Sequence, residues 1–270
     1  MRIAHKMKRL FFVLILIPLH VVAQRARVSW IDDDFDLSSV NRIIDVCNSL
    51  SISIDFALVP TYVDSLNEYI FTQKQISYIH QLSERGHCFE IHPYHSGWYN
   101  SQSSNIYMGE TYIEQQIVKT KNVFEKYHIE HSNCIVYPGS SHTNKKIVSI
   151  ARNYFDYGIA SNGTYNLIDE ENSDVYQRLF IQLSTDKPKS YYKQMIDDGV
   201  REGAWIIIGT HSWQFDDRNS VPDETTMSIV NLSEIIEYAN SLSKIEHIRD
   251  VFEDRCKIYF LDRSVCRFYP

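Results

Sequence analysis

The chain has 270 residues and a formal net charge of −7, from 27 basic and 34 acidic side chains. Its fractions of hydrophobic residues (44%) and charged residues (23%) are those of an ordinary globular protein and not of a disordered one. No basic cluster follows the first nine residues, so we expect no nucleic-acid partner. The length suits one domain with a sizeable core.

The N-terminal residues predict a secretory signal peptide. Met1 to Arg9 is basic, Leu10 to Val22 is almost wholly apolar, and Val21-Val22-Ala23 is a small-residue cleavage pattern. The apolar run is short for a membrane span, and an uncleaved N-terminal anchor is the alternative. We therefore expect a signal peptide over residues 1–23, a single domain over residues 24–270, and a secreted or periplasmic protein with no stable membrane span after cleavage.

The five cysteines do not form a metal-binding or redox motif in the sequence, because no C-x-x-C occurs. Cys47, Cys88 and Cys134 lie in apolar patterns, where cysteine behaves as a small buried hydrophobe. Cys256 and Cys266 are the pair that could form a disulfide.

Apolar runs and amphipathic helical patterns alternate along the chain. The predicted strands are Val28 to Ile31, Ile52 to Val59, Cys88 to His92, Cys134 to Tyr137, Tyr157 to Ala160, Tyr176 to Leu183, Ala204 to Ile208 and a short closing strand, Ile258 to Leu261. The first predicted helix begins at a cap, Ser38 or Ser39, and its apolar face is Val40, Ile43, Ile44, Cys47 and Leu50. The other predicted helices are Gln73 to Arg85, Glu110 to Tyr127, Lys145 to Tyr154, Tyr191 to Glu202 and Leu232 to Ile245.

This alternation predicts an α/β protein with a parallel sheet buried on both faces. About seven strand–helix units favour a distorted or incomplete (β/α) barrel, with about seven parallel strands, over an open sheet. In either architecture the catalytic and ligand-binding residues lie at the carboxyl ends of the strands. The residues that follow each predicted strand are therefore the candidate site residues.

The strand Cys88 to His92 ends in a pair of histidines. Pro93 biases His92 toward extended geometry, which places His92 at the strand end and His95 in the loop that follows. Two imidazoles that leave a strand end together are plausible metal ligands. The alternative is that they are ordinary loop histidines bonded to the backbone.

Three other strand ends carry polar groups or a tight turn: Asp32-Asp33-Asp34, Tyr137-Pro138-Gly139 and Gly209-Thr210-His211. Two histidines and one carboxylate are a usual ligand set for a catalytic divalent ion. A second carboxylate can deprotonate water, and a further histidine can protonate a leaving group. Taken alone, the aspartates also fit a solvated acidic loop or the start of a helix, and His211 also fits a core histidine.

Together these segments resemble the motifs of the polysaccharide deacetylases with a NodB-homology domain. The T-F-D-D-G motif of that family resembles Trp30-Ile31-Asp32-Asp33-Asp34, and its H-[ST]-x-x-H motif, with the preceding Gly-His, resembles Gly86-His87 and His92 to His95. Its third motif, R-x-P-x-G or a Tyr-Pro variant, resembles Val136 to Gly139. Its L-x-H motif resembles Gly209-Thr210-His211.

The resemblance implies a distorted (β/α) barrel that hydrolyses N- or O-acetyl groups on a polysaccharide or oligosaccharide. It implies Asp32 as general base, His211 as general acid and the Gly139 N–H as an oxyanion donor. It further implies Asp33, His92 and His95 as ligands of zinc or another divalent transition metal. The expected substrate contacts are Tyr137, Pro138, Trp98 and Trp213, although each tryptophan also fits a packed core.

The sequence departs from the family pattern at several positions. The two histidines His92 and His95 are three residues apart, whereas those of the family motif are four apart. Val136 replaces the arginine of the third motif. Asp34 replaces the glycine of the first motif, which leaves open a shift by one residue that makes Asp33 the base and Asp34 the ligand. The family's fourth motif, which supports the acid histidine, has no evident counterpart.

These departures leave two other functions open. One is a non-catalytic carbohydrate-binding protein on a decayed deacetylase barrel, and the other is a metal hydrolase acting on a different ester or amide. The 18 tyrosines are compatible with a carbohydrate ligand, because Tyr stacks on sugar rings, but core and surface packing accounts for them equally well. The main prediction is a metal-dependent carbohydrate deacetylase.

Overall fold

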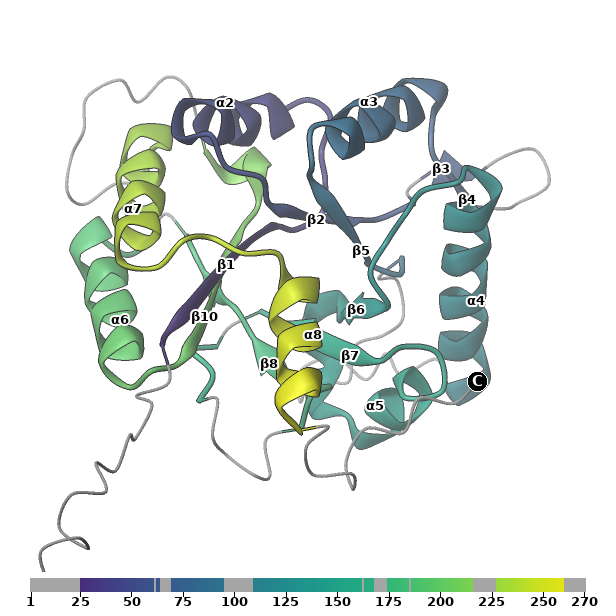
Figure 1. Cartoon of the computed structure of the whole chain (residues 1–270). Helices are drawn as coiled ribbons and strands as arrows, with labels where there is room; N and C mark the ends of the chain where they lie inside the picture. Colours follow the sequence, from purple (N-terminus) through teal and green to yellow (C-terminus); the bar gives the residue numbers. More distant parts are fainter. Residues whose placement is uncertain are drawn as a thin grey trace, which may run out of the picture.

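The computed structural model describes residues 25–60, 62–63, 69–94, 109–161, 163–167, 174–184, 186–215 and 227–259. The predicted signal peptide, His95, Trp98 and Cys266 lie outside these residues, as does the side chain of Cys256. Within them, helices surround a central parallel sheet (Figure 1). No helix in the described ranges is both long enough and apolar enough to span a membrane.

The sheet has eight strands, in the order β8-β7-β6-β5-β2-β1-β10-β9, and all of its pairings are parallel. The strands are β1 (Arg27–Asp32), β2 (Asp55–Leu58), β5 (Cys88–Ile91), β6 (Cys134–Val136), β7 (Tyr157–Ala160), β8 (Arg178–Leu179), β9 (Ile181–Gln182) and β10 (Trp205–Thr210). A separate antiparallel pair, β3 (Tyr62–Val63) and β4 (Tyr69–Ile70), lies between β2 and α3 in the sequence.

The helices are α2 (Val40–Leu50), α3 (Gln73–Glu84), α4 (Glu110–Lys126), α5 (Lys145–Ala151), α6 (Lys189–Arg201), α7 (Ile229–Leu242) and α8 (Ile248–Tyr259). Two 3-10 helices, η1 (Pro138–Thr143) and η2 (Ser212–Gln214), directly follow the ends of β6 and β10. Helices α2 to α7 surround the sheet, whereas α8 crosses its centre in the view of Figure 1.

The outermost strands, β8 and β9, form the seam of a nearly closed barrel. Only Phe180 separates them in the sequence, and its N–H donates to the Ala160 carbonyl at 2.8 Å. Its ring lies so close to Gly209 on β10 that a Cβ added there would be 2.0 Å from it, so only glycine fits. The predicted incomplete barrel is confirmed, with the predicted strand Tyr176 to Leu183 divided into two short strands at the seam.

Alternate residues of each strand face the helices and the barrel interior. Trp30, Phe56, Phe89 and Ile91 belong to the large core between sheet and helices. A second core fills the barrel interior, with members Ile31, Ala57, Cys134, Val136, Tyr157, Ile159, Phe180, Trp205 and Ile207. Successive residues of a strand face opposite sides of the sheet, so the two cores also show which polar residues of each strand point into the barrel.

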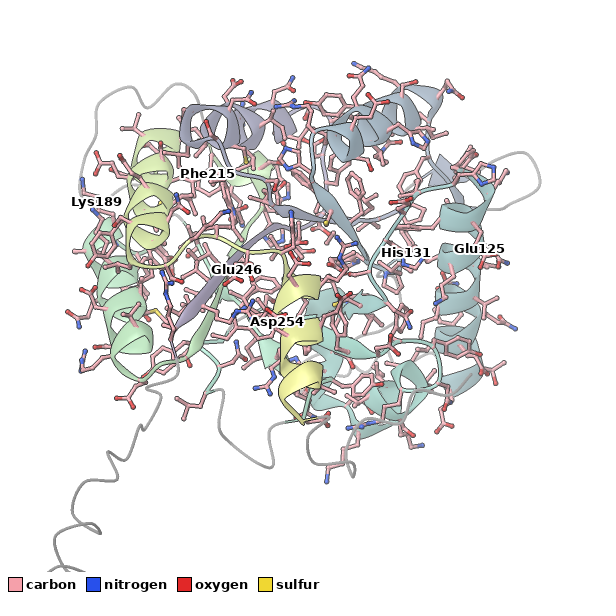
Figure 2. All side chains as sticks on the ribbon, viewed as in Figure 1. Glu125, His131, Lys189, Phe215, Glu246 and Asp254 are labelled. Atoms are coloured by element: carbon pink, nitrogen blue, oxygen red, sulfur yellow. The ribbon has the colours of Figure 1, made fainter. Side chains whose placement is uncertain are left out.

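Helix α8 closes the amino-terminal end of the barrel. Its side chains Ile248, Val251 and Phe252 belong to the interior core, and the Phe252 ring stacks on Tyr157 with centroids 3.8 Å apart. Arg27, at the start of β1, holds this closure by ion pairs to Glu246 and Asp254, both labelled in Figure 2. The predicted closing strand Ile258 to Leu261 is therefore wrong over Ile258 and Tyr259, which belong to α8.

Candidate active site

The carboxyl ends of the strands meet at one mouth of the barrel. The parallel register pairs Asp32 with Thr210 at the ends of β1 and β10, and Leu58 with Ile91 at the ends of β2 and β5. The residues after β1, β5 and β10 therefore leave the sheet at the same edge. These are Asp33 and Asp34, His92, and His211.

Asp32 does not face the mouth. It shares the outer face of β1 with Trp30, and its Oδ1 accepts a 2.8 Å hydrogen bond from the Thr210 hydroxyl, which in turn accepts one from Trp30 Nε1 at 3.0 Å. Complete burial raises the pKa of Asp32 well above its ordinary value, against the opposing effect of the Thr210 hydrogen bond. The hydrogen bond from Thr210 ties β1 to β10.

Asp33 and Asp34 lie beside His92 at the mouth. Nε2 of His92 is 3.7 Å from Oδ1 of Asp33 and 3.7 Å from Oδ1 of Asp34. One ligand atom from each of the three residues lies within 4.8 Å of the others. Burial raises the pKa of Asp33, and the neighbouring His92 opposes this effect.

The backbone at Asp34 brings the two carboxylates together. Asp34 has φ 66°, in the left-handed region that a short polar side chain such as Asp tolerates better than most residues. Its N–H donates to Oδ1 of Asp33 at 3.2 Å, and its carboxylate bends back to reach His92. Unusual backbone conformations of this kind are often retained at functional sites.

In its neutral form His92 presents an unprotonated nitrogen to the carboxylates. Its Nδ1 lies 2.9 Å from the carbonyl oxygen of Pro93, which can only accept, so Nδ1 carries the proton and donates. Nε2 then has a free lone pair, which is the arrangement of a metal-ligating histidine whose other nitrogen is held by a carbonyl. A contact of 3.7 Å is too long for a hydrogen bond.

The donor set therefore fits a divalent transition metal. Ligands about 2.1 Å from one ion lie about 3.0 to 3.6 Å apart, and the two 3.7 Å distances from Nε2 of His92 to the carboxylates are close to this range. Two carboxylate oxygens and one imidazole nitrogen are typical ligands of zinc, cobalt or iron. Asp33, Asp34 and His92 are thus the described residues at the mouth from which the ligands of an ion would be drawn.

His211 approaches the same two carboxylates from β10. Its Nε2 is 3.6 Å from Oδ2 of Asp33 and 3.5 Å from Oδ2 of Asp34. Its Nδ1 lies 2.7 Å from Nε2 of Gln182 at the end of β9. The Gln182 amide nitrogen also reaches the Leu183 carbonyl at 3.4 Å, which favours this orientation of the amide because the flipped one would set oxygen against oxygen.

Gln182 thereby gives His211 the opposite tautomer to His92. Because the amide N–H donates to Nδ1, the proton of a neutral His211 lies on Nε2, which faces the mouth as a donor. Such an N–H is a hydrogen-bond donor and not a metal ligand. To protonate a leaving group His211 must first become an imidazolium, which requires the Gln182 amide to turn so that its oxygen accepts from Nδ1. The sequence offered no motif for Gln182, and the only signal was its place at the end of a short strand.

The other predicted residues are placed as follows. Trp213 is 53% exposed beside the mouth, and its ring centroid is 5.3 Å from that of His211. Gly139, with φ 54°, follows the end of β6 and is exposed, whereas the side chains of Tyr137 and Pro138 are buried. His95 and Trp98 lie outside the described residues.

Comparison with solved structures relates this fold to the family 4 carbohydrate esterases. Similar structures include the Xyl-CE4 domain of a multidomain xylanase from the hindgut metagenome of Trinervitermes trinervoides (TM-score 0.52, 16% identity, 86% of this chain and 92% of that one). They also include a family 4 acetyl xylan esterase from Clostridium thermocellum in complex with a cobalt ion (0.52, 18%, 84% and 90%). A third is the peptidoglycan N-acetylglucosamine deacetylase Bc1960 (0.50, 15%, 87% and 97%).

Comparisons with protein-family models and with curated proteins find no match. The structural similarity covers most of the chain and gives it the fold of the polysaccharide deacetylases, the NodB-homology fold. At these sequence identities the similarity concerns the fold. The chemistry of this chain is therefore inferred from the residues at the mouth of the barrel.

Proposed function

We propose that this protein is a metal-dependent deacetylase that removes N- or O-acetyl groups from a polysaccharide or oligosaccharide. The observation that carries the proposal is the convergence of Asp33, Asp34, His92 and His211 at the mouth of a polysaccharide-deacetylase fold. The two histidines present different groups there, a lone pair on His92 and an N–H on His211. Metal-assisted hydrolysis requires both kinds of group.

The family's first motif matches its Asp-Asp pair to Asp32 and Asp33. We shift the roles of that pair by one residue, to Asp33 and Asp34. Asp34 and His92 would hold the divalent ion, and Asp33, which lies between His92 and His211, would act as general base. Asp32 would be structural, because its carboxyl group is on the other face of β1. His95 stays a predicted additional ligand.

When bound, a divalent cation would supply Lewis acidity at the acetyl carbonyl. Asp33 accepts a proton from the attacking water, which forms the new C–O bond to the carbonyl carbon. The bond to the sugar nitrogen or oxygen then breaks, and Nε2 of His211 in its imidazolium form gives its proton to that leaving atom, which leaves a neutral imidazole. The products are acetate and a free amine or alcohol. The Gly139 N–H stays the predicted oxyanion donor, and the exposed Trp213 ring offers an apolar wall for a sugar.

The experiment compares Asp33→Asn with Asp32→Asn in protein loaded with zinc or cobalt. Acetate release is measured on acetylated xylan, chitin oligomers and peptidoglycan. Loss of a general base lowers kcat by about 10²- to 10⁴-fold, so we expect this loss in Asp33→Asn with metal content retained. Asp32→Asn should stay within about tenfold of wild type, because Asn has nearly the shape of a protonated Asp.

The reverse result, with Asp32→Asn inactive and Asp33→Asn active, would restore the assignment implied by the unshifted motif. A wild-type protein that binds metal but releases acetate from no substrate would favour the non-catalytic carbohydrate-binding function. Activity confined to other esters or amides would favour the third function.

A further inference from the structure

A second group of metal-ligand residues lies at the opposite end of the barrel. Asp55 begins β2, Cys88 begins β5, and His247 immediately precedes α8. One ligand atom from each lies within 4.8 Å of the other two. Since β2 and β5 run parallel toward the mouth, this group sits at the amino ends of the strands, away from Asp33 and His92.

The carboxylate of Asp55 is completely buried and held from two sides. Its Oδ2 accepts a hydrogen bond from the N–H of Ile248 at 3.0 Å, and its Oδ1 lies 3.2 Å from Nδ1 of His247. The backbone hydrogen bond fixes the orientation of the carboxylate and leaves Oδ1 directed at the imidazole. A metal-ligating carboxylate is typically fixed in this way through its second oxygen.

The imidazole of His247 is fixed from its other side as well. Its Nε2 lies 2.9 Å from the hydroxyl oxygen of Ser53. Without an ion, Nδ1 donates to Oδ1 of Asp55, because a carboxylate oxygen only accepts. A bound ion would take the place of this proton, and Nε2 would then carry the proton and donate to Ser53. The geometry thus contains ligand atoms and the supporting hydrogen bonds that orient them, which is the usual construction of a metal centre.

The spacing also suits one shared ion. Ligands about 2.1 Å from a tetrahedral zinc lie about 3.4 Å apart, and Oδ1 of Asp55 is 3.2 Å from Nδ1 of His247. A thiolate, an imidazole and a carboxylate are ligands that favour zinc-like ions over magnesium or calcium, which select oxygen ligands. A direct ion pair between Asp55 and a protonated His247 is the competing state at the same distance.

A cavity of about 700 Å³ adjoins the group, and Ser53, His247, Lys244, Glu246 and Asp250 are among the residues that line it. Cys88 and His247 are partly exposed, whereas Asp55 is not. Of the three proposed ligands His247 lines this cavity, so an ion could approach the group from solvent on the side of His247.

We propose that Asp55, Cys88 and His247 form a second metal site, for a borderline-soft divalent transition metal such as Zn²⁺. The ion would join β2 and β5 to His247, the residue before α8, and so stabilise the packing of α8 against the amino-terminal end of the barrel. This site does not depend on the proposed deacetylase activity. Its ligand set differs from that of the mouth in containing a thiol.

The thiol gives the site a spectroscopic signature. Cobalt(II) is titrated into the full-length metal-free protein, and absorption is followed in the near ultraviolet, where thiolate-to-cobalt charge transfer appears. We expect the band in wild type and in Asp34→Asn, because the described mouth residues include no thiol ligand. We expect it to be absent in Cys88→Ser and unchanged in Cys47→Ala, which removes a buried thiol of the helix-side core.

Zinc is tested by thermal unfolding of the same variants, with His247→Gln added in case Cys88→Ser does not fold. Zinc should raise the Tm of wild type and of Asp34→Asn by several degrees more than that of His247→Gln, because binding to the folded state stabilises it. No charge-transfer band in wild type, a band that survives in Cys88→Ser, or an equal zinc shift in His247→Gln would each overturn the proposal. Neither measurement depends on acetate release. A negative result for the second metal site would therefore leave the proposed deacetylase function untouched, and the reverse also holds.

Discussion

At the scale of single residues, hydrogen bonds at Nδ1 decide what each mouth histidine can do. His92 donates to the Pro93 carbonyl and keeps a lone pair at Nε2, whereas His211 accepts from Gln182 and keeps a proton there. Both Nε2 atoms face Asp33 and Asp34 within 4 Å. The same side chain therefore presents a lone pair or an N–H at Nε2 according to the partner of its Nδ1.

A third histidine, His87, gives a prediction about pH. Its Nδ1 accepts a 3.2 Å hydrogen bond from the N–H of Ile54, and burial lowers its pKa from 6.5 to about 4. Between these values the unfolded chain binds a proton that the folded protein does not, so the free energy of unfolding falls as pH drops from 6.5 to 4. Through His87 alone, the free energy of unfolding is lower by about 3 kcal/mol at pH 4 than at neutral pH.

Urea denaturation over this pH range checks the prediction. His87→Gln, which keeps an acceptor for Ile54, should lose less stability on acidification than wild type. The control is His128→Asn, because His128 is exposed and Asn tolerates its φ of 52°. Parallel stability curves for His87→Gln and wild type would contradict the prediction.

At the scale of elements, amphipathic spacing predicted the helices well and their termini less well. The predicted helix Gln73 to Arg85 corresponds to α3 (Gln73–Glu84), with Ile76, Ile79 and Leu82 buried. Its first residue is set by Thr72, whose hydroxyl accepts from the Gln75 N–H at 3.2 Å while the Gln75 side chain accepts from the Thr72 N–H at 2.8 Å. This capping box satisfies two donors that the helix itself leaves free.

Removal of this cap should destabilise the protein. Thr72→Ala removes the hydroxyl acceptor, and we expect the free energy of unfolding to fall by about 1 kcal/mol. Ser77→Ala, at an exposed position within the same helix, should change it by no more than a few tenths of a kcal/mol or raise it slightly. Chemical denaturation of the two variants measures both values, and equal effects would show that the cap contributes nothing.

At the scale of the whole molecule, α8 closes the barrel interior and is the element that the sequence pattern missed. Phe252 is 6% exposed, and its ring lies 3.8 Å from that of Tyr157 and 4.9 Å from that of Trp205, centroid to centroid. These partners lie on β7 and β10. One side chain of α8 therefore joins two distant strands of the barrel.

Truncation of this side chain should have a large effect. Phe252→Ala leaves a cavity inside the barrel and should lower the free energy of unfolding by about 3 to 5 kcal/mol. Val230→Ala, at a position 37% exposed on α7, should lower it by less than about 1 kcal/mol. Urea denaturation compares the two, and a loss near that of Val230→Ala in the Phe252 variant would mean that α8 does not contribute to the stability of the barrel.

The sequence alone determined the strand–helix alternation, the incomplete parallel barrel, and the strand ends that carry Asp33, His92 and His211. It could do so because side-chain periodicity is local, and because parallel strands deliver their carboxyl ends to one edge. Only the tertiary structure decided that Asp32 faces outward and Asp34 joins the mouth. Alternation separates neighbouring residues onto two faces, and the tertiary packing that buries Trp30 in the core beneath the helices and Ile31 in the barrel interior decides which face is inside. The meeting of Asp55 with His247, 192 residues later, likewise follows from the placement of α8 across the barrel floor and from no local pattern.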